Sequence, residues 1–97
     1  MRGSEQAKTR PCVVLSANEI NAQRKTVVVI PLTTTKTPAV PPLLVSVPSA
    51  GLDSKARVEQ IRAVDKSRLR NRLGSLSDAD LLEIEGALQR ILGIRPM

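Results

Sequence analysis

The run Thr26-Val27-Val28-Val29-Ile30 constrains the fold of this chain most strongly. Its β-branched residues favour an extended strand. They also follow one another without the polar–apolar alternation of a strand that has one face in water. We therefore expect a strand that is buried on both faces. We expect it to end at Pro31, because proline cannot donate a hydrogen bond to a neighbouring strand.

Shorter apolar runs, each bounded by proline or by polar turn residues, predict three further strands over residues 11–16, 43–47 and 54–64. The last of these alternates only loosely, which leaves room for a bulge. The remaining segments predict loops over 1–8 and 33–42, turns over 49–53 and 65–67, a polar turn or short helical piece over 18–25, and an ambiguous piece over 69–73.

The C-terminal part of the chain predicts a helix. Ser77 can cap it, and Asp80 three residues later completes a capping-box pattern, while Gly93 is a suitable residue to end it. A stripe of aliphatic residues at helical spacing gives this helix one apolar face: Leu81, Ile84, Leu88, Ile91 and Leu92. Strands followed by one terminal helix predict a small α+β, mainly β, fold, either a barrel or a sheet with the helix packed on it.

The composition excludes several classes of site. The chain has no Phe, Tyr or Trp, so its core must be aliphatic and it cannot stack nucleic-acid bases on aromatic rings. It has no histidine and one cysteine, Cys12, which excludes an internal disulfide, a Cys or His metal site and a histidine acid–base pair; we expect no cofactor. The sequence contains no membrane-length apolar run and no signal peptide, which predicts a cytoplasmic protein.

The charge is basic and uneven. The net charge is +6, with 13 basic and 5 acidic residues over 1–76 but 2 basic and 4 acidic residues over 77–97. A basic surface outside the C-terminal segment can bind a polyanion. On charge alone, a basic protein without a nucleic-acid ligand is an equally good interpretation.

Four stretches together resemble the MazF/PemK family of toxins. Residues 3–16 (GSEQAKTRPCVVLS) closely resemble the family's Gly-Ser-Glu-Gln loop, which is followed by Arg-Pro and a strand. Residues 26–33 resemble its central strand ending in threonine, residues 59–65 its Gln-Ile-Arg-x-x-Asp strand, and residues 76–93 its terminal helix. The resemblance covers essentially the whole chain, as one toxin domain over residues 1–97. It departs in one place, since the family's first strand normally precedes the Gly-Ser-Glu-Gln loop and this chain starts at Met1.

The resemblance implies the toxin of a type II toxin–antitoxin pair with an SH3-like β-barrel and a C-terminal helix. It further implies a homodimer that cleaves single-stranded RNA in a groove across the dimer, and a cognate antitoxin whose acidic, flexible C-terminal segment fills that groove. No membrane partner is implied. RNA can be cut without a metal ion, because the ribose 2′-hydroxyl can attack its own phosphate and leave a 2′,3′-cyclic phosphate and a 5′-hydroxyl.

Two residues align with the family's catalytic pair. Arg10 aligns with its arginine, and a guanidinium can grip two phosphate oxygens but cannot act as a base near neutral pH. Thr33 aligns with its threonine, whose hydroxyl can orient the phosphate or relay a proton. Without the resemblance, Arg10 is a surface cation at the start of a strand, and Thr33 is the start of a polar loop.

Substrate-binding residues follow from the same alignment, and each has a structural alternative. The candidates lie in the first loop, after the central strand and in the Gln-Ile-Arg motif: Ser4, Gln6, Lys36, Gln60 and Arg62. Ser4 and Gln6 can instead cap a turn, and Arg62 can form a structural salt bridge with Asp65. Arg68, Arg70 and Arg72 fit a solvated face better than a phosphate track.

Two alternative functions stay open. A gyrase-poisoning toxin of the CcdB type has the same fold, but it acts through a Trp-Gly-Ile type C-terminus, and this chain contains no tryptophan. A catalytically inert RNA-binding module is the second alternative.

Overall fold

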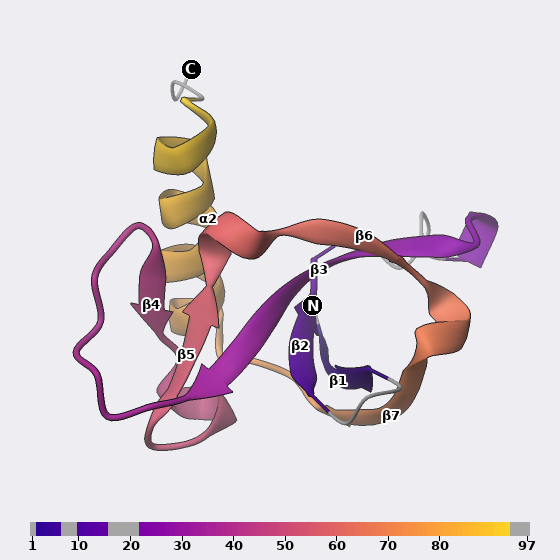
Figure 1. The fold of residues 1–97 in the computed structure, drawn as a ribbon, viewed down its shortest axis with the longest axis horizontal. Helices are drawn as coiled ribbons and strands as arrows, with labels where there is room; N and C mark the ends of the chain where they lie inside the picture. Colours follow the sequence, from indigo (N-terminus) through magenta and orange to yellow (C-terminus); the bar gives the residue numbers. More distant parts are fainter. Residues whose placement is uncertain (1, 7–9, 16–21, 94–97) are drawn as a thin grey trace.

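A computed structural model describes residues 2–6, 10–15 and 22–93 of the chain (Figure 1). The described residues form one antiparallel sheet and a C-terminal helix, α2 (Asp78–Leu92). Short 3-10 turns, η1 (Pro48–Ala50), η2 (Val58–Gln60) and η3 (Lys66–Arg68), join several strands. The strands are β1 (Arg2–Gln6), β2 (Pro11–Val14), β3 (Thr26–Thr34), β4 (Leu44–Ser46), β5 (Ser54–Arg57), β6 (Arg62–Asp65) and β7 (Leu69–Gly74).

Strand β3 organises the molecule because it pairs along both of its edges. One edge pairs with β2, with Val13 opposite Ile30. The other edge is shared, so that β6 pairs with residues 26–29 and β5 pairs with residues 32–34. Ile30 belongs to one buried aliphatic cluster and Val29 to a second. Successive side chains of a strand point to opposite faces, so the two clusters confirm that this strand is buried on both sides.

The prediction that Pro31 ends the strand is wrong, since β3 continues to Thr34. The N–H of Leu15 donates to the carbonyl of Val28, so Val28, and by alternation Ile30, turn their backbone groups towards β2. The nitrogen of Pro31 therefore turns to the other edge. It lies there between the pair that ends the β6 ladder, Val29 with Arg62, and the pair Leu32 with Ala56 that begins the β5 ladder. A missing N–H costs nothing in this gap.

Three other segment boundaries also differ from the prediction. Residues 2–6 are not a loop but strand β1, which pairs with β2 and β7, because both neighbours offer backbone groups that need partners. Residues 33 and 34 belong to β3 rather than to the following loop. Residues 54–64 form two strands, since η2 turns the chain between β5 and β6. Half of the turn or helical piece predicted over 18–25, residues 18–21, lies outside the described residues; in the described half, residues 22 and 23 form a short helical piece.

The predicted strands at 11–16 and 43–47 are confirmed in shortened form, and the ambiguous residues 69–73 form β7. The mainly β fold with a C-terminal helix is also confirmed. The hydrogen-bonded order of the described strands is β4-β5-β3-β2-β1-β7, with β6 on β3. The sheet curls strongly, and β6, η3 and β7 form an arch around β1 and β2 (Figure 1). The end strands of this order, β4 and β7, do not pair with each other, so the sheet is not a closed barrel.

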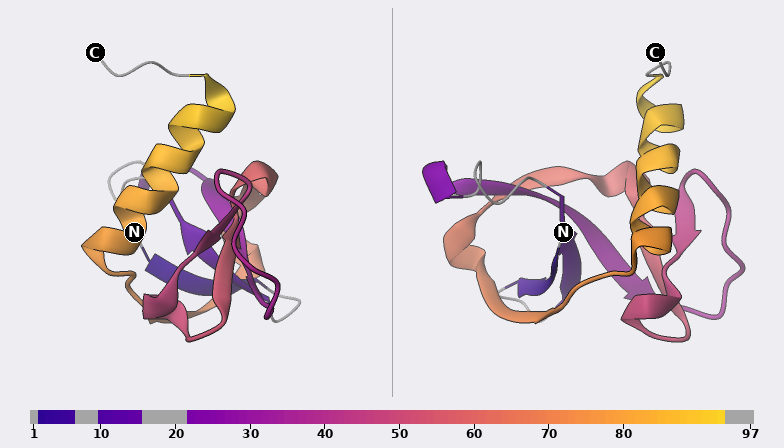
Figure 2. Two further views of the ribbon diagram at one scale, coloured as in Figure 1. Left: turned by 90° about the vertical axis from the view of Figure 1, so that its left-hand side faces the viewer. Right: turned by 180° about the vertical axis from the view of Figure 1, so that it is seen from behind.

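Helix α2 covers the far side of β4 and β5 in the view of Figure 1, as the reverse view shows (Figure 2). Its buried Ile84 and Ala87 pack into the same aliphatic cluster as Ile30. The predicted ends are confirmed, because the Ser77 hydroxyl accepts from the N–H of Asp80 at 3.2 Å and Gly93 has a left-handed φ of 69°. No helix in the described residues is long and apolar enough to cross a membrane.

The second half of the capping box is replaced by a contact with η1. The Asp80 carboxylate does not reach back to the N–H of Ser77; it accepts from the N–H of Ser49 at 2.9 Å and from the Ser49 hydroxyl. Ser49 Oγ in turn accepts from the N–H of Ser77 at 3.0 Å. The start of α2 is thus tied to the turn between β4 and β5.

Candidate active site

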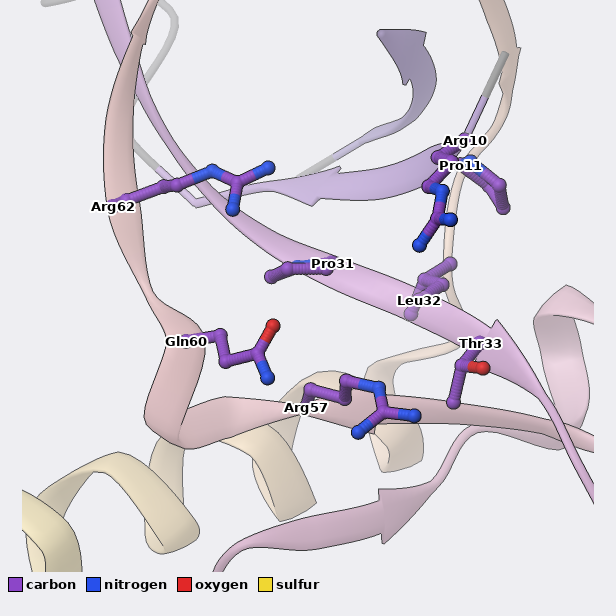
Figure 3. Close-up of a pocket in the computed structure, with 8 residues that line it drawn as sticks. All are labelled: Arg10, Pro11, Pro31, Leu32, Thr33, Arg57, Gln60 and Arg62. Carbon is purple, nitrogen blue, oxygen red and sulfur yellow. The ribbon is translucent and has the colours of Figure 1, made fainter. Parts of the chain in front are cut away.

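A pocket of about 220 Å³ opens on the side of the sheet opposite α2. It lies where β3 passes from its β6 partner to its β5 partner, so its floor is the gap beside Pro31. Eight described residues line it, seven from β2, β3, β5, η2 and β6 and one from the position before β2 (Figure 3): Arg10, Pro11, Pro31, Leu32, Thr33, Arg57, Gln60 and Arg62.

The two predicted catalytic residues line this pocket together. Cys12 is opposite Pro31 in the β2–β3 ladder, so continuing the register by two residues brings Arg10 opposite Thr33. Arg10 is exposed and Thr33 is half-buried. In Figure 3 the Arg10 side chain descends over Leu32 towards the end of β3 that carries Thr33. Residues separated by more than twenty positions in the chain therefore meet at one end of the pocket.

Two of the predicted substrate-binding residues, Gln60 and Arg62, lie at the other end of the pocket. Gln60 ends η2, and Arg62 begins β6, where it is opposite Val29 of β3. Because η2 turns the chain after β5, it places Gln60 at its own end and Arg62 two residues later on the wall of the pocket. Asp65 instead holds the next turn, because its carboxylate accepts from the N–H of Ser67 at 2.9 Å.

Of the other three predicted binding residues, Lys36 is not among the described residues that line the pocket, and only the backbone of Ser4 and Gln6 is described. Lys36 is exposed in the loop after β3. Ser4 and Gln6 lie in β1, where Ser4 is opposite Cys12 and Gln6 is opposite Leu69 of β7. The backbone of β1 is thus placed on the far edge of β2 from β3.

Arg57 is a residue of the pocket that the sequence analysis missed. It ends β5, where the buried Ala56 packs into the cluster that contains Ile84, so that Arg57 points to the opposite, exposed side. The signal was present in the sequence, because Lys55 and Arg57 alternate with Ala56 and Val58 directly before the Gln-Ile-Arg motif. A two-residue alternation within a segment that also turns is easily overlooked.

The pocket is strongly cationic. Among the described residues that line it, three are arginines and none is acidic. Burial raises the pKa of the nearby Cys12 thiol, and the positive charge of Arg62 partly offsets that rise. Guanidinium groups donate hydrogen bonds and keep their charge, so they suit phosphate oxygens. The arrangement can therefore bind a phosphate group beside the Thr33 hydroxyl. No cluster of acidic, histidine or cysteine side chains suited to a metal ion lies in the described part of the chain.

Comparison with known proteins shows the family of this chain. The family of PemK-like, MazF-like toxins of type II toxin–antitoxin systems matches residues 1–92. This chain belongs to that family. Among MazF relatives, the Endoribonuclease MazF of Staphylococcus epidermidis is 34% identical over 98 residues, which cover 97% of this chain and 82% of the relative. Endoribonuclease MazF9 of Mycobacterium tuberculosis is 36% identical over 96 residues, covering 91% and 81%.

Solved endoribonuclease structures have the same fold. An endoribonuclease from a mycobacterial species superposes with a TM-score of 0.84 at 28% identity, covering 98% of this chain and 91% of the other. A mycobacterial endoribonuclease in complex with its cognate antitoxin gives a TM-score of 0.83 at 24% identity, covering 98% and 95%, a likeness that shows the fold alone.

Proposed function

We propose that this MazF/PemK-family toxin is an endoribonuclease that cleaves single-stranded RNA, including mRNA, without a metal ion and at selected sequences. The observation that carries the proposal is that Arg10 and Thr33 line one cationic pocket, although they come from different strands. The curated relatives are named endoribonucleases, which supports the same reaction class.

The proposed reaction uses the nucleophile of the RNA itself. The 2′-oxygen forms a bond to the adjacent phosphorus as the bond from phosphorus to the 5′-oxygen breaks, giving a 2′,3′-cyclic phosphate and a 5′-hydroxyl. Arg10 stabilises the negative charge that grows on the non-bridging oxygens. A planar guanidinium is well suited to this role, because it can donate two parallel hydrogen bonds to a pair of phosphate oxygens. The Thr33 hydroxyl orients the phosphate and relays the 2′-proton towards water, and a water molecule protonates the leaving 5′-oxygen. DNA lacks the 2′-hydroxyl, so the chemistry selects RNA.

The neighbouring nucleotides have candidate contacts along the same surface. Gln60 and Arg62 at the far end of the pocket are placed to contact the adjoining nucleotide. We assign Ser4, Gln6 and Lys36 to flanking RNA contacts in a homodimer, where a second subunit would complete the groove. The cognate antitoxin would inhibit by filling this cationic groove with an acidic segment, and an mRNA target would be met in the cytoplasm.

The proposal is tested with the purified chain and end-labelled single-stranded RNA in EDTA. We expect cleavage that leaves 2′,3′-cyclic phosphate ends, identified by mass spectrometry. Arg10→Ala should lower the rate about 100-fold or more, as is common when one donor to a developing anion is removed. Arg90→Ala, which changes an exposed arginine of α2, serves as the matched control.

The alternatives give different results in the same assay. Binding of RNA without cleavage would identify an inert RNA-binding module. DNA breaks trapped with gyrase would identify a gyrase poison. Cleavage that needs a divalent cation, or that leaves other ends, would refute the proposed chemistry.

A further inference from the structure

Arg57 faces Arg10 across the strand that carries Thr33. On one edge of β3 the register brings Arg10 opposite Thr33, and on the other edge Leu32 is opposite Ala56, so Arg57 lies beside Pro31. Neighbouring strands of a sheet are roughly 5 Å apart, so β2 and β5 are separated by roughly 10 Å across β3. Two arginine side chains that extend over β3, one from each edge, can bridge this distance and contact the same phosphate.

The close-up view supports this orientation. The Arg57 side chain extends along β5 towards the end of the pocket that holds Thr33, and the Arg10 guanidinium descends towards β3 from the opposite wall (Figure 3). Arg62 and Gln60 lie at the other end of the pocket. The Arg62 side chain points towards β2, at the end of the pocket opposite Thr33 (Figure 3).

No contact with another described residue gives Arg57 a structural role. Its neighbour Lys55 has one, since its Nζ donates to the carbonyl of Thr35 at 2.8 Å and its side chain is buried. Arg57 is exposed, and among the described residues no carboxylate pairs with it. An arginine that points into a pocket without an acidic partner is available to an anionic ligand.

We propose that Arg57 is a further catalytic residue that grips the reacting phosphate from the β5 side while Arg10 grips it from the β2 side. This inference rests on the proposed nuclease function. As the 2′-oxygen bonds to phosphorus, charge accumulates on the two non-bridging oxygens, and each guanidinium stabilises one of them. The proposed path of the 2′-proton through Thr33 stays the same. Arg57 contributes more in the transition state than in the bound state, because the oxygens carry more charge there.

The test separates cleavage from binding. A cut site is first mapped on a long RNA with the wild-type protein, and a short RNA with that site is used at saturating enzyme for single-turnover rates. The same RNA with a 2′-deoxy residue at the cleaved nucleotide gives the Kd without reaction. The variants are Arg57→Ala and Arg57→Lys, with Arg90→Ala and Arg90→Lys as matched controls and thermal unfolding as the check of folding.

We expect Arg57→Ala to lower the single-turnover rate about 100-fold while weakening the Kd by less than about threefold. Arg57→Lys should recover only part of the rate, because an ammonium keeps the charge but not the planar fork. A phosphorothioate at the cut site gives a further readout. One diastereomer should slow the wild type and have no additional effect on Arg57→Ala, because the oxygen that it replaces has lost its partner.

Each other outcome has its own meaning. Wild-type rates in both Arg57 variants would overturn the inference and leave the nuclease proposal standing. A weakened Kd with an unchanged rate at saturation would also overturn it, since Arg57 would then only attract RNA. Failure of the wild type to cleave any RNA would overturn the proposed function, and the role of Arg57 with it.

Discussion

The attachment of helix α2 to turn η1 gives the most specific stability prediction. The buried Asp80 carboxylate accepts from both the N–H and the hydroxyl of Ser49. It also lies in the first turn of α2, where the helix dipole favours a negative charge. Asp78 lies in the same turn but is exposed and has no bond to Ser49. Asp78 is therefore a matched control that shares the dipole effect and lacks the Ser49 contacts.

The magnitudes follow from these contacts. A hydrogen bond to a charged group contributes about 1.5–3 kcal/mol, against about 1 kcal/mol for a neutral one. Because both Ser49 groups share Asp80 Oδ2, Asp80→Ala should cost about 3 kcal/mol. Asp80→Asn keeps the shape but loses the charge, at about 1.5 kcal/mol. Asp78→Asn loses only the dipole effect, at about 0.5 kcal/mol.

Urea denaturation followed by far-ultraviolet circular dichroism measures these free energies, and thermal unfolding gives a second estimate. At about 4–8 °C per kcal/mol for a domain of this length, Asp80→Ala should lower the Tm by about 15 °C. A double-mutant cycle with Ser49→Ala should give a coupling of about 1 kcal/mol or more. Equal losses in Asp80→Asn and Asp78→Asn, or a cycle that closes to zero, would refute the argument that Ser49 holds the helix start.

Two further predictions concern titratable groups. The backbone N–H of Ser67 lowers the pKa of Asp65 below its ordinary 3.8, so this carboxylate contributes stability above pH 3.8 that is lost as the pH falls through the lowered pKa. The difference in unfolding free energy between wild type and Asp65→Asn should therefore shrink as the pH is lowered through and below 3.8, and a constant difference would contradict this. Burial raises the pKa of the Cys12 thiol and shields it from reagents. At pH 8 the native thiol should therefore react with Ellman's reagent at least about 100-fold more slowly than the thiol of the urea-unfolded chain. An equal rate would contradict its buried position.

The elements that the sequence predicted best are those whose signals are local. The capping serine, aliphatic stripe and terminal glycine of α2 act within a few residues of one another, and the ends of the helix were predicted correctly. The run from Thr26 to Ile30 likewise predicted burial on both faces, since the consecutive apolar side chains of Val27 to Ile30 favour burial whichever strand pairs with them. The resemblance to the MazF/PemK family supplied Arg10 and Thr33, which the local patterns favoured only as surface residues.

The errors came from features that depend on tertiary partners. Residues 2–6 have no strand pattern of their own, and they extend because β2 and β7 lie on either side. The Asp80 carboxylate matched a capping box, but Ser49, 31 residues earlier, supplies its partner. Arg57 was overlooked for the same reason, because its orientation depends on the pairing of β5 with β3.

The wrongly placed strand end explains where the pocket lies. A strand whose edge is fully paired leaves no opening, whereas β3 changes partner from β6 to β5, and η2 bends the chain away between them. An ordinary residue at position 31 would turn an N–H into this gap and require a hydrogen-bond acceptor there. Pro31 removes that requirement, so the gap can be lined by the side chains of Arg57, Gln60 and Arg62 on one wall and of Arg10 on the other. The residue that suggested the end of a strand thus permits the strand to continue to Thr33, and the continuation brings the Thr33 hydroxyl between the arginines.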